Sequence, residues 1–228
     1  YKRQIQRMPA TLELALFSLF IAIFFGIPLG IYAGLKPKSK VSKTIMAGSI
    51  LGFSMPTFWV GIIFIMIFAV HLGWLPSTGR GELGTFLGIQ SSLFTANGLS
   101  HVFLPALNLA LFKMSSVIRL TRAGTREIIL QDYITFARSK GLSEEKVVLV
   151  HVLRNILIPI VTVIGLEFGS LIAFSTVTET IFAWPGMGKL IIDSIYNLDR
   201  PVIVAYLMII VTFFAVSYTH LRAHETDR

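Results

Sequence analysis

Residues 132–159 read DYITFARSKGLSEEKVVLVHVLRNILIP, and this stretch is the longest polar interruption of helical character between the apolar runs of the chain. From Arg119 to Arg154 the chain carries seven lysines and arginines and four acidic residues, a net charge of +3. A positively charged segment between membrane spans lies on the cytoplasmic side. We therefore predict a folded cytoplasmic segment that serves as a docking surface.

Within this stretch, the residue pattern indicates two short helices that meet at Gly141. The residues with helical spacing before the junction are Tyr133, Phe136, Ala137 and Lys140. Gly141 can end the first helix, since glycine commonly follows a helix C-terminus. Ser143 can cap the second helix. Glu144 and Glu145 then fall in its first turn, where acidic side chains suit the helix dipole.

The composition of the chain requires lipid as the solvent for part of its surface. Of 228 residues, 54% are hydrophobic and only 14% are charged, and the mean hydropathy is +0.74. A water-soluble domain carries about 25% charged residues. A net charge of +8 is also typical of nucleic-acid binding, but the cations lie in loops that flank apolar runs. That placement favours membrane topology and anionic lipid headgroups, so we predict no nucleic-acid partner.

Five apolar runs predict an all-α fold, a polytopic transmembrane helical bundle. The runs are Ala10–Leu35, Ile45–Val70, Val102–Ile118, Ile156–Val177 and Val202–Val216. About 20 apolar residues are needed to cross a bilayer, and the fifth run is shorter than this. In the first run, the glycines of GIPLGIYAG (26–34) recur at four-residue spacing, which lets another helix approach closely.

The distribution of lysine and arginine between the loops sets the orientation. The loop 36–43 carries four and the region 119–154 carries seven, whereas the opposite side has Arg80 in one loop and Lys189 and Arg200 in the other. We therefore place a cytoplasmic loop at 119–155 and external loops at 73–101 and 179–201. Residues 1–218 are predicted to form one transmembrane domain, and 219–228 an atypical polar tail of foreign or truncated origin.

Polar residues in or beside the apolar runs are candidates for a transport pathway. Helix breakers at mid-membrane depth are tolerated where the backbone is shielded by protein or lines a cavity, which points to Ser54 and Pro56. Intramembrane polar and ionisable side chains are functional candidates by default, which adds Asn108, Glu167 and Glu179. An ordinary packing kink at Pro56 and a structural hydrogen bond from Glu167 are the alternative explanations.

The motifs of common catalytic and metal sites are absent from the sequence. It contains no HExxH zinc motif, no GxSxG nucleophile motif and no cysteine. The segment Gly186–Leu190 lacks the first glycine and the Ser or Thr of a phosphate-binding loop. We therefore predict that the chain is not an enzyme and binds no cofactor or metal, so that any nucleotide energy comes from another chain.

Taken together, these segments resemble a known family of membrane transporters. ARSKGLSEEKVVLVHVLRNILIP (137–159) resembles the cytoplasmic signature loop of ABC-importer permeases, in particular the B-type permease of the dipeptide, oligopeptide and nickel uptake branch. The resemblance covers Pro9 to Val216. Other segments that resemble this branch are PATLELAL (9–16), GIPLGIYAG (26–34), SMPTFWVG (54–61), GWLPSTG (73–79), LPALNLAL (104–111), HVLRNILIPIVTVIG (151–165) and ETIFAWPGMGKL (179–190).

The resemblance implies a type I ABC-importer permease fold, with six spans in the family and five in this sequence. It implies a multi-pass protein of the bacterial inner membrane, in contact with membrane lipid. The implied partners are a second, homologous permease, two cytosolic ATPase subunits and an external solute-binding protein. ATP and magnesium would bind on the ATPase subunits. The implied cargo is dipeptides, longer peptides, nickel or glutathione.

The resemblance also implies which residues couple the chain to an ATPase. The signature loop of the family forms a coupling helix that seats in a groove of the ATPase. The matching residues would shape the turn, make polar contacts or lead back into the membrane. They are Ala137, Arg138, Lys140, Gly141, Leu142, Ser143, Glu144 and Pro159.

One alternative from a different class is a proton- or ion-coupled secondary transporter that uses Glu167 and Glu179. It predicts internal inverted repeats, which we do not find in the sequence, and it leaves the stretch 132–159 without a role. A membrane-embedded enzyme is a further alternative, but the sequence offers it no nucleophile–base or metal constellation.

Overall fold

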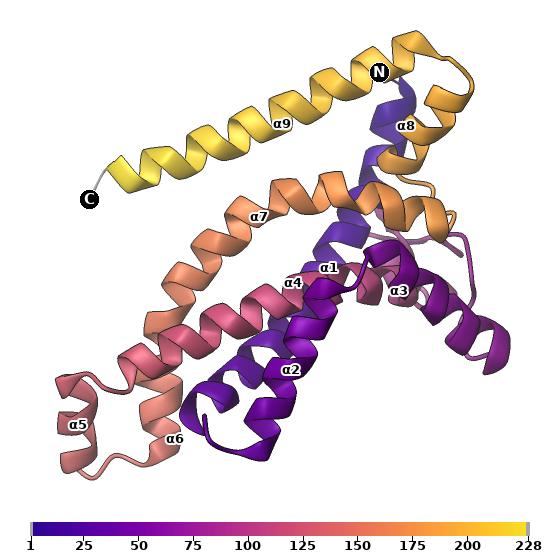
Figure 1. Cartoon of the computed structure of the whole chain (residues 1–228). Coiled ribbons are helices and arrows are strands. Elements are labelled where there is room, and N and C mark those ends of the chain that lie inside the picture. The colour runs from indigo at the N-terminus through magenta and orange to yellow at the C-terminus, as the bar shows by residue number, and fades with distance from the viewer. Residues whose placement is uncertain (1, 227–228) are drawn as a thin grey trace. The chain divides into compact units, whose positions relative to one another are not determined.

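The computed structural model describes the backbone of residues 2–226 (Figure 1). The side chains that it describes exclude Leu166, Glu167, Ala173, Phe213, Phe214 and 216–226. The predicted pathway residue Glu167 and the side chains of the predicted tail 219–228 therefore lie outside the described residues.

The regular secondary structure of the described chain is helical apart from one short hairpin, which confirms the all-α prediction. The pattern of long apolar helices joined by short polar turns is the one that lipid requires, since a helix satisfies its own backbone hydrogen bonds. The elements are α1 (Lys2–Leu35), α2 (Lys40–Ser54), α3 (Thr57–Phe64), η1 (Ile65–His71), β1 (Gly84–Phe86), β2 (Ile89–Ser91), η2 (Ser92–Phe94), α4 (Ala96–Ile128), α5 (Asp132–Ser139), α6 (Glu144–Lys146), η3 (Val147–Val152), α7 (Leu153–Ile181), α8 (Met187–Tyr196) and α9 (Arg200–Thr226).

Within the described residues, three helical stretches are long and apolar enough to cross a membrane: Lys2–Leu35, Ala96–Ile128 and Glu144–Gly165. The helix pair α2 and α3–η1 makes a fourth if it is one broken span, and the apolar part of α9, Arg200–Thr212, is shorter. Each predicted apolar run thus forms helix. The fourth begins at Glu144 instead of Ile156, because α6, η3 and α7 follow one another without a break.

The break that the sequence predicts in the second run lies between α2 and α3. Helix α2 ends at Ser54, and Pro56 has extended backbone angles, with φ −61° and ψ 130°. Proline disfavours a helical conformation in the residue before it and has no N–H to donate to the preceding turn. A new helix begins directly after it, as the N–H groups of Trp59 and Val60 donate to the Pro56 carbonyl at 3.1 and 3.2 Å.

The chain divides into two compact units. Unit 1 comprises residues 1–20, 55–110 and 166–228, and unit 2 comprises 21–54 and 111–165. Helices α1, α4 and α7 each contribute residues to both units. Unit 2 contains the signature stretch that the sequence singles out, and unit 1 contains both predicted external loops.

In unit 2, α1 and α4 pack at close range through the glycines of GIPLGIYAG. A Cβ atom added to Gly30 would lie 2.5 Å from Cβ of Thr121 and 2.9 Å from the carbonyl oxygen of Ile118. Only a residue without a side chain allows this separation, so the predicted close approach is confirmed. The facing pairs are Gly26 with Val117, Gly30 with Thr121 and Gly34 with Thr125.

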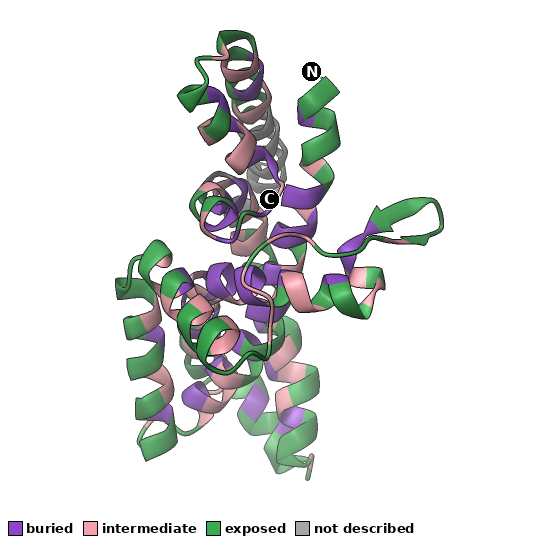
Figure 2. Cartoon of the chain, turned by 90° about the vertical axis from the view of Figure 1, so that its right-hand side faces the viewer, coloured by how far each residue is buried: buried purple, intermediate pink, exposed green. Residues whose placement is uncertain are grey.

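In unit 1, the predicted external loop 73–101 is more ordered than the sequence indicates. Strands β1 and β2 pair antiparallel, with Gly84 opposite Ser91 and Phe86 opposite Ile89. Leu87 and Gly88 connect them with φ of 49° and 80°, which matches a two-residue hairpin turn. The tip projects into solvent, with Leu87 86% exposed (Figure 2).

Helix α4 begins at Ala96, earlier than the predicted start at Val102. Thr95 caps it, since its hydroxyl oxygen accepts the N–H of Gly98 at 2.9 Å. The loop also packs against this end, because the Thr95 hydroxyl donates to the Glu82 carbonyl at 2.7 Å. The stretch TANG (95–98) is a local N-terminal signal that sequence reasoning could have used.

The α1–α4 contact predicts that alanine in place of Gly30 destabilises unit 2, whereas alanine in place of Gly48 does not. Gly30→Ala should lower the free energy of unfolding by about 1–3 kcal/mol, because the new methyl group overlaps Thr121 and the α4 backbone. The measurement is thermal or denaturant unfolding of the purified chain in detergent.

Gly48→Ala is the matched control, since no atom lies within 4 Å of its added Cβ. It should leave stability unchanged or raise it by up to about 1 kcal/mol through helix propensity. Equal unfolding midpoints for the two variants would contradict the close packing of α1 on α4.

Candidate functional site

Helix α5 has one buried face and one exposed face. Its chain enters through Gln131 in an extended conformation, and the Ile134 N–H donates to the Gln131 carbonyl at 3.0 Å. Ile134 and Ala137, one turn apart, are buried, whereas Tyr133 and Phe136 are exposed. The exposed fraction of Phe136 is 60%, which is high for a large aromatic side chain and leaves it available for a partner.

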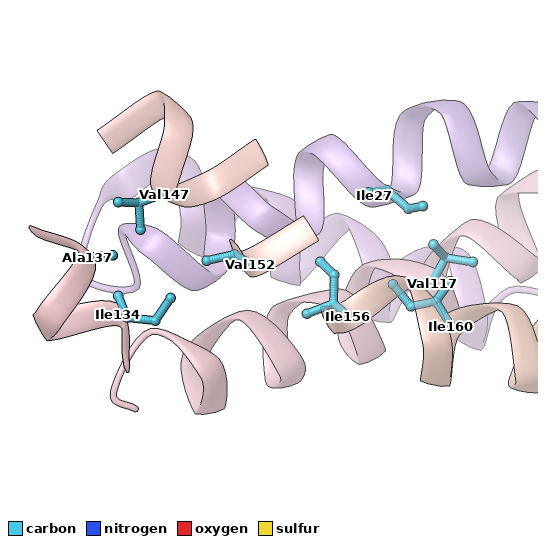
Figure 3. Close-up of a cluster of buried hydrophobic side chains, with 8 residues drawn as sticks. All are labelled: Ile27, Val117, Ile134, Ala137, Val147, Val152, Ile156 and Ile160. Atoms are coloured by element: carbon cyan, nitrogen blue, oxygen red, sulfur yellow. The ribbon is translucent and has the colours of Figure 1, made fainter. Parts of the chain in front are cut away.

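The buried face of α5 belongs to the hydrophobic core of unit 2 (Figure 3). The side chains around it come from η3 and from the first turns of α7, and the core continues along α1 and α4. Because α5 is packed on these elements, it is part of the folded unit and not a loose loop. The core residues are Ile27, Val117, Ile134, Ala137, Val147, Val152, Ile156 and Ile160.

A Schellman turn ends α5 at Gly141. The Gly141 N–H donates to the Arg138 carbonyl at 2.9 Å, and the Leu142 N–H donates to the Ala137 carbonyl at 3.4 Å. Gly141 has φ +77°, the left-handed conformation that this turn requires. Leu142 packs against the hydrophobic cluster that includes Ala137, and a hydrophobic contact commonly accompanies this motif.

A serine cap begins the next helix as the sequence predicts. Ser143 is extended, with φ −64° and ψ 149°, and its hydroxyl accepts the Lys146 N–H at 3.5 Å. Glu144 and Glu145 occupy the first turn, near the positive end of the helix dipole. The prediction of two short helices joined at Gly141 is therefore confirmed.

The charged residues of this segment contact each other across the turn. Arg138 Nε lies 2.8 Å from Glu144 Oε1, and a second guanidinium nitrogen lies 3.2 Å from Oε2. Lys140 Nζ lies 4.5 Å from the centroid of the Phe136 ring. The ion pair is largely exposed and contributes at most about 1 kcal/mol, so it orients the two side chains more than it stabilises the fold. Contact of these residues with an ATPase stays a prediction.

A second polar link fastens α5 to α7, and sequence reasoning missed it. Asn155 Nδ2 donates to the Tyr133 hydroxyl at 3.3 Å and to the His151 carbonyl at 2.6 Å. The local sequence does not predict this contact, because Tyr133 and Asn155 belong to separate helices. Pro159 follows on the exposed side of α7, and the helix continues through it.

Glu179 is fully buried in unit 1 and accepts hydrogen bonds from three elements. The hydroxyls of Thr11 and Ser175 donate to its Oε1 at 2.7 and 3.1 Å, and the Lys189 N–H donates to Oε2 at 3.0 Å. Gly186 leaves room for the carboxylate, since an added Cβ would lie 2.4 Å from it. These contacts join α1, α7 and α8 and give Glu179 a structural role, while its pathway role stays a prediction.

A second buried carboxylate, Glu13, holds the hairpin loop to α1. Arg80 forms an ion pair with Glu13, and the Ser92 hydroxyl and N–H donate to the same carboxylate, the latter at 3.1 Å. The Arg80 guanidinium also lies 5.9 Å from the centroid of the Trp184 ring. Sequence reasoning did not pair them, although each is the lone charge of its sign in its segment, Glu13 in the first run and Arg80 in the loop.

Asn108 is a buried polar residue in the core of unit 1. Its Nδ2 donates to the Thr178 hydroxyl at 3.0 Å, while its Oδ1 has no hydrogen-bond partner among the described residues. Gly61 of α3 lies against it, since a Cβ added there would be 3.3 Å from Asn108 Nδ2. This residue thus connects α4 to α7, and its pathway role stays a prediction.

The remaining predicted pathway residues lie at the helix break. The Ser54 hydroxyl donates to the Ile50 carbonyl at 2.8 Å, one turn earlier in α2. Both Ser54 and Pro56 are exposed. Among the described side chains, no group of three or more His, Asp or Glu residues is placed to hold a metal ion.

Long apolar helices interrupted by one amphipathic, charged helical turn define a polytopic membrane protein. The chain belongs to the family described as "Binding-protein-dependent transport system inner membrane component", whose model matches residues 26–224. The family places the chain in a membrane and favours the importer interpretation over a secondary transporter.

Curated relatives in this family are similar along nearly the whole chain. A di/tripeptide transport system permease protein, DppB, of Pseudomonas aeruginosa is 43% identical over 223 residues, 90% of this chain and 66% of the relative. An oligopeptide transport system permease protein, AppB, of Bacillus subtilis is 41% identical and covers 89% and 62%. A glutathione transport system permease protein, GsiC, of Escherichia coli is 37% identical and covers 89% and 61%. The chain therefore spans about two thirds of the length of the curated relatives that it matches.

Solved structures share the fold at low sequence identity. A chain of the MetNI methionine ABC transporter in an inward-facing conformation has a TM-score of 0.70 at 17% identity, and the match covers 96% of this chain and 95% of that one. A chain of an amino acid ABC transporter with histidines has a TM-score of 0.66 at 15% identity, covering 100% and 94%. These matches confirm the expected fold of a type I importer permease.

The Glu179 network predicts a large loss of stability when its carboxylate is removed. Glu179→Ala should lower the free energy of unfolding by at least about 2 kcal/mol, because the Lys189 N–H and the Thr11 hydroxyl lose their buried acceptor. Thermal or denaturant unfolding of the purified variant in detergent measures this loss of stability.

Glu145→Ala serves as the matched control, because Glu145 is exposed. Its effect should stay within about 0.5 kcal/mol. If both glutamates could be replaced with equally small effects, the structural role of Glu179 would be wrong.

Proposed function

We propose that this chain is a permease subunit of an ATP-driven importer of short peptides, with α5 as the helix that a cytosolic ATPase moves. The observation that carries the proposal is the construction of α5. One face is anchored in the core of unit 2, and the other presents exposed aromatic and charged side chains. The proposed assembly has a second, homologous permease, two ATPase subunits that bind ATP and magnesium, and an external solute-binding protein.

In this mechanism α5 transmits displacement because residues before and after the Gly141 turn pack on the same core. Ile134 and Ala137 contact the core together with Val147 and Val152 of η3, which continues into α7. When ATP binding closes the ATPase pair, a push on α5 moves α7 with it, whereas a loose loop would absorb the motion. The helix bundle would then alternate between two packing arrangements, one with the pathway open to the outside and one with it open to the cytosol.

The exposed face of α5 offers the chemistry for such a contact. Tyr133 and Phe136 supply apolar area, and the Arg138–Glu144 pair and Lys140 supply oriented charge. Buried aromatic side chains surrounded by polar groups are the usual composition of a tight protein interface. We assign this face to the ATPase groove.

The names of the relatives support a peptide cargo. They are permeases for di- and tripeptides, oligopeptides, dipeptides and glutathione, which share a peptide backbone with charged ends. We therefore propose short peptides, rather than nickel, as the cargo of the assembly. Uptake of labelled dipeptide, tripeptide, glutathione and nickel by proteoliposomes that contain the full assembly distinguishes them, and uptake of nickel alone overturns the peptide assignment.

Gly141→Pro should abolish ATP-linked peptide uptake, a loss of at least about tenfold, while the chain still inserts into the membrane. Proline cannot adopt φ +77° and removes the N–H that donates to the Arg138 carbonyl, at a cost of about 3 kcal/mol for the turn. The measurement is ATP-dependent uptake of labelled dipeptide by reconstituted proteoliposomes, together with the amount of inserted chain.

Gly141→Asn is the control, since asparagine tolerates the left-handed conformation and keeps the N–H. Its uptake should stay close to that of the unaltered chain, because open space surrounds Gly141. Normal transport by an inserted Gly141→Pro variant would end the assignment of α5 as the coupling helix.

A further inference from the structure

The net charge of the chain belongs entirely to unit 2. Unit 2 contains twelve lysines and arginines and four acidic residues, whereas unit 1 contains eight of each. The resulting +8 of unit 2 equals the net charge of the whole chain. Unit 2 therefore has a surplus of cations that complements a negatively charged partner.

The densest part of this surplus is residues 36–43, the turn that follows α1 together with the first turn of α2, which we call the lysine turn. No acidic residue occurs between Glu13 and Glu82, so nothing nearby in the sequence offsets its charge. All of its cations are exposed. They are Lys36, Lys38, Lys40 and Lys43.

These lysines have no acidic partner, in contrast to three cations of unit 1. Among the described residues, none of the four forms an ion pair, whereas Arg3, Arg80 and Lys189 in unit 1 each pair with a carboxylate. Lys36 instead has its Nζ 5.7 Å from the centroid of the Tyr32 ring. The cations of the lysine turn are therefore available to an external anion.

The lysine turn is also held in one conformation. The Ser39 N–H donates to the Lys36 carbonyl at 3.1 Å, and the Ser42 N–H donates to Ser39 Oγ at 3.0 Å. The Ser42 hydroxyl in turn donates to the Ala33 carbonyl of α1 at 3.2 Å. An ordered turn loses little conformational entropy when it binds a ligand.

The surroundings of the turn identify the anion. It connects two apolar helices of an inner membrane component, Val41 is exposed between Lys40 and Lys43, and Ile50 and Leu51 are exposed about two turns further along α2. Apolar side chains that face lipid and cations at their end match an acyl chain and its phosphate. We propose that the lysine turn binds the headgroup of an anionic phospholipid, whose acyl chains lie along the exposed side of α2.

An acidic surface of an ATPase is the competing partner for these cations. The lipid is favoured because Val41 lies between Lys40 and Lys43 and is itself exposed. A protein surface made for four cations would leave this apolar side chain opposed to acidic groups. The proposal does not depend on the cargo of the transporter or on the role of α5.

The test is lipid retention by the purified full chain in detergent, measured by native mass spectrometry with added cardiolipin, phosphatidylglycerol or phosphatidylcholine. We expect retention of the two anionic lipids over phosphatidylcholine. Replacing the four lysines of the turn by glutamine should lower anionic-lipid retention at least about tenfold, since each lysine near an anionic surface is worth on the order of fivefold. Replacement by arginine should preserve it.

The matched control removes four cations of unit 1, through Lys2→Gln, Arg3→Gln, Lys189→Gln and Arg200→Gln, and should keep the preference. Unchanged retention in the lysine-turn variant, or an equal loss in the control, overturns the proposal. So does a loss of ATPase binding with lipid retention unchanged. The unaltered chain gives an independent test, because its preference for anionic lipid should fall as salt is raised, and a preference insensitive to salt overturns the proposal.

Discussion

The burial of one face of α5 in unit 2 is the interaction on which the proposed function depends. Ile134 has no exposed surface, and burying such a side chain contributes about 1.5–3 kcal/mol. Ala137, its neighbour one turn later, is buried beside it and also supplies the carbonyl that closes the Gly141 turn. The same contact therefore fixes both the position of α5 and the geometry of its end.

Much of unit 2 could be predicted from the sequence because its signals are local. Gly141 and Ser143 specify a helix end and a helix start through backbone geometry within a few residues, and the structure has both. The four-residue spacing of the glycines in residues 26–34 likewise predicted a close helix contact, which the structure has. What the sequence did not specify was the partner, since nothing in that spacing identifies Thr121 or Thr125 as the facing residues.

Unit 1 was harder to predict, because its determining contacts join distant parts of the chain. Glu179 and Thr11 meet across 168 residues, and Arg80 reaches Glu13 across 67. The hairpin strands have three residues each, too few for an alternating pattern to stand out. Glu179 was interpreted as a pathway candidate and Glu13 was assigned no role, and the oxygens of both carboxylates accept hydrogen bonds within the protein, as burial in an apolar medium demands.

The contact between α1 and α4 also provides a fixed internal distance in unit 2. Glycine has no side chain that could rotate to accommodate sliding, so Gly30 and the backbone of α4 at Ile118 keep one separation as long as the helices stay packed. Spectroscopic labels attached to the outer faces of these helices should report a constant length throughout a transport cycle. Because the chain contains no cysteine, thiol-directed labels can be introduced there without background, and movements of α5 can be calibrated against that fixed length.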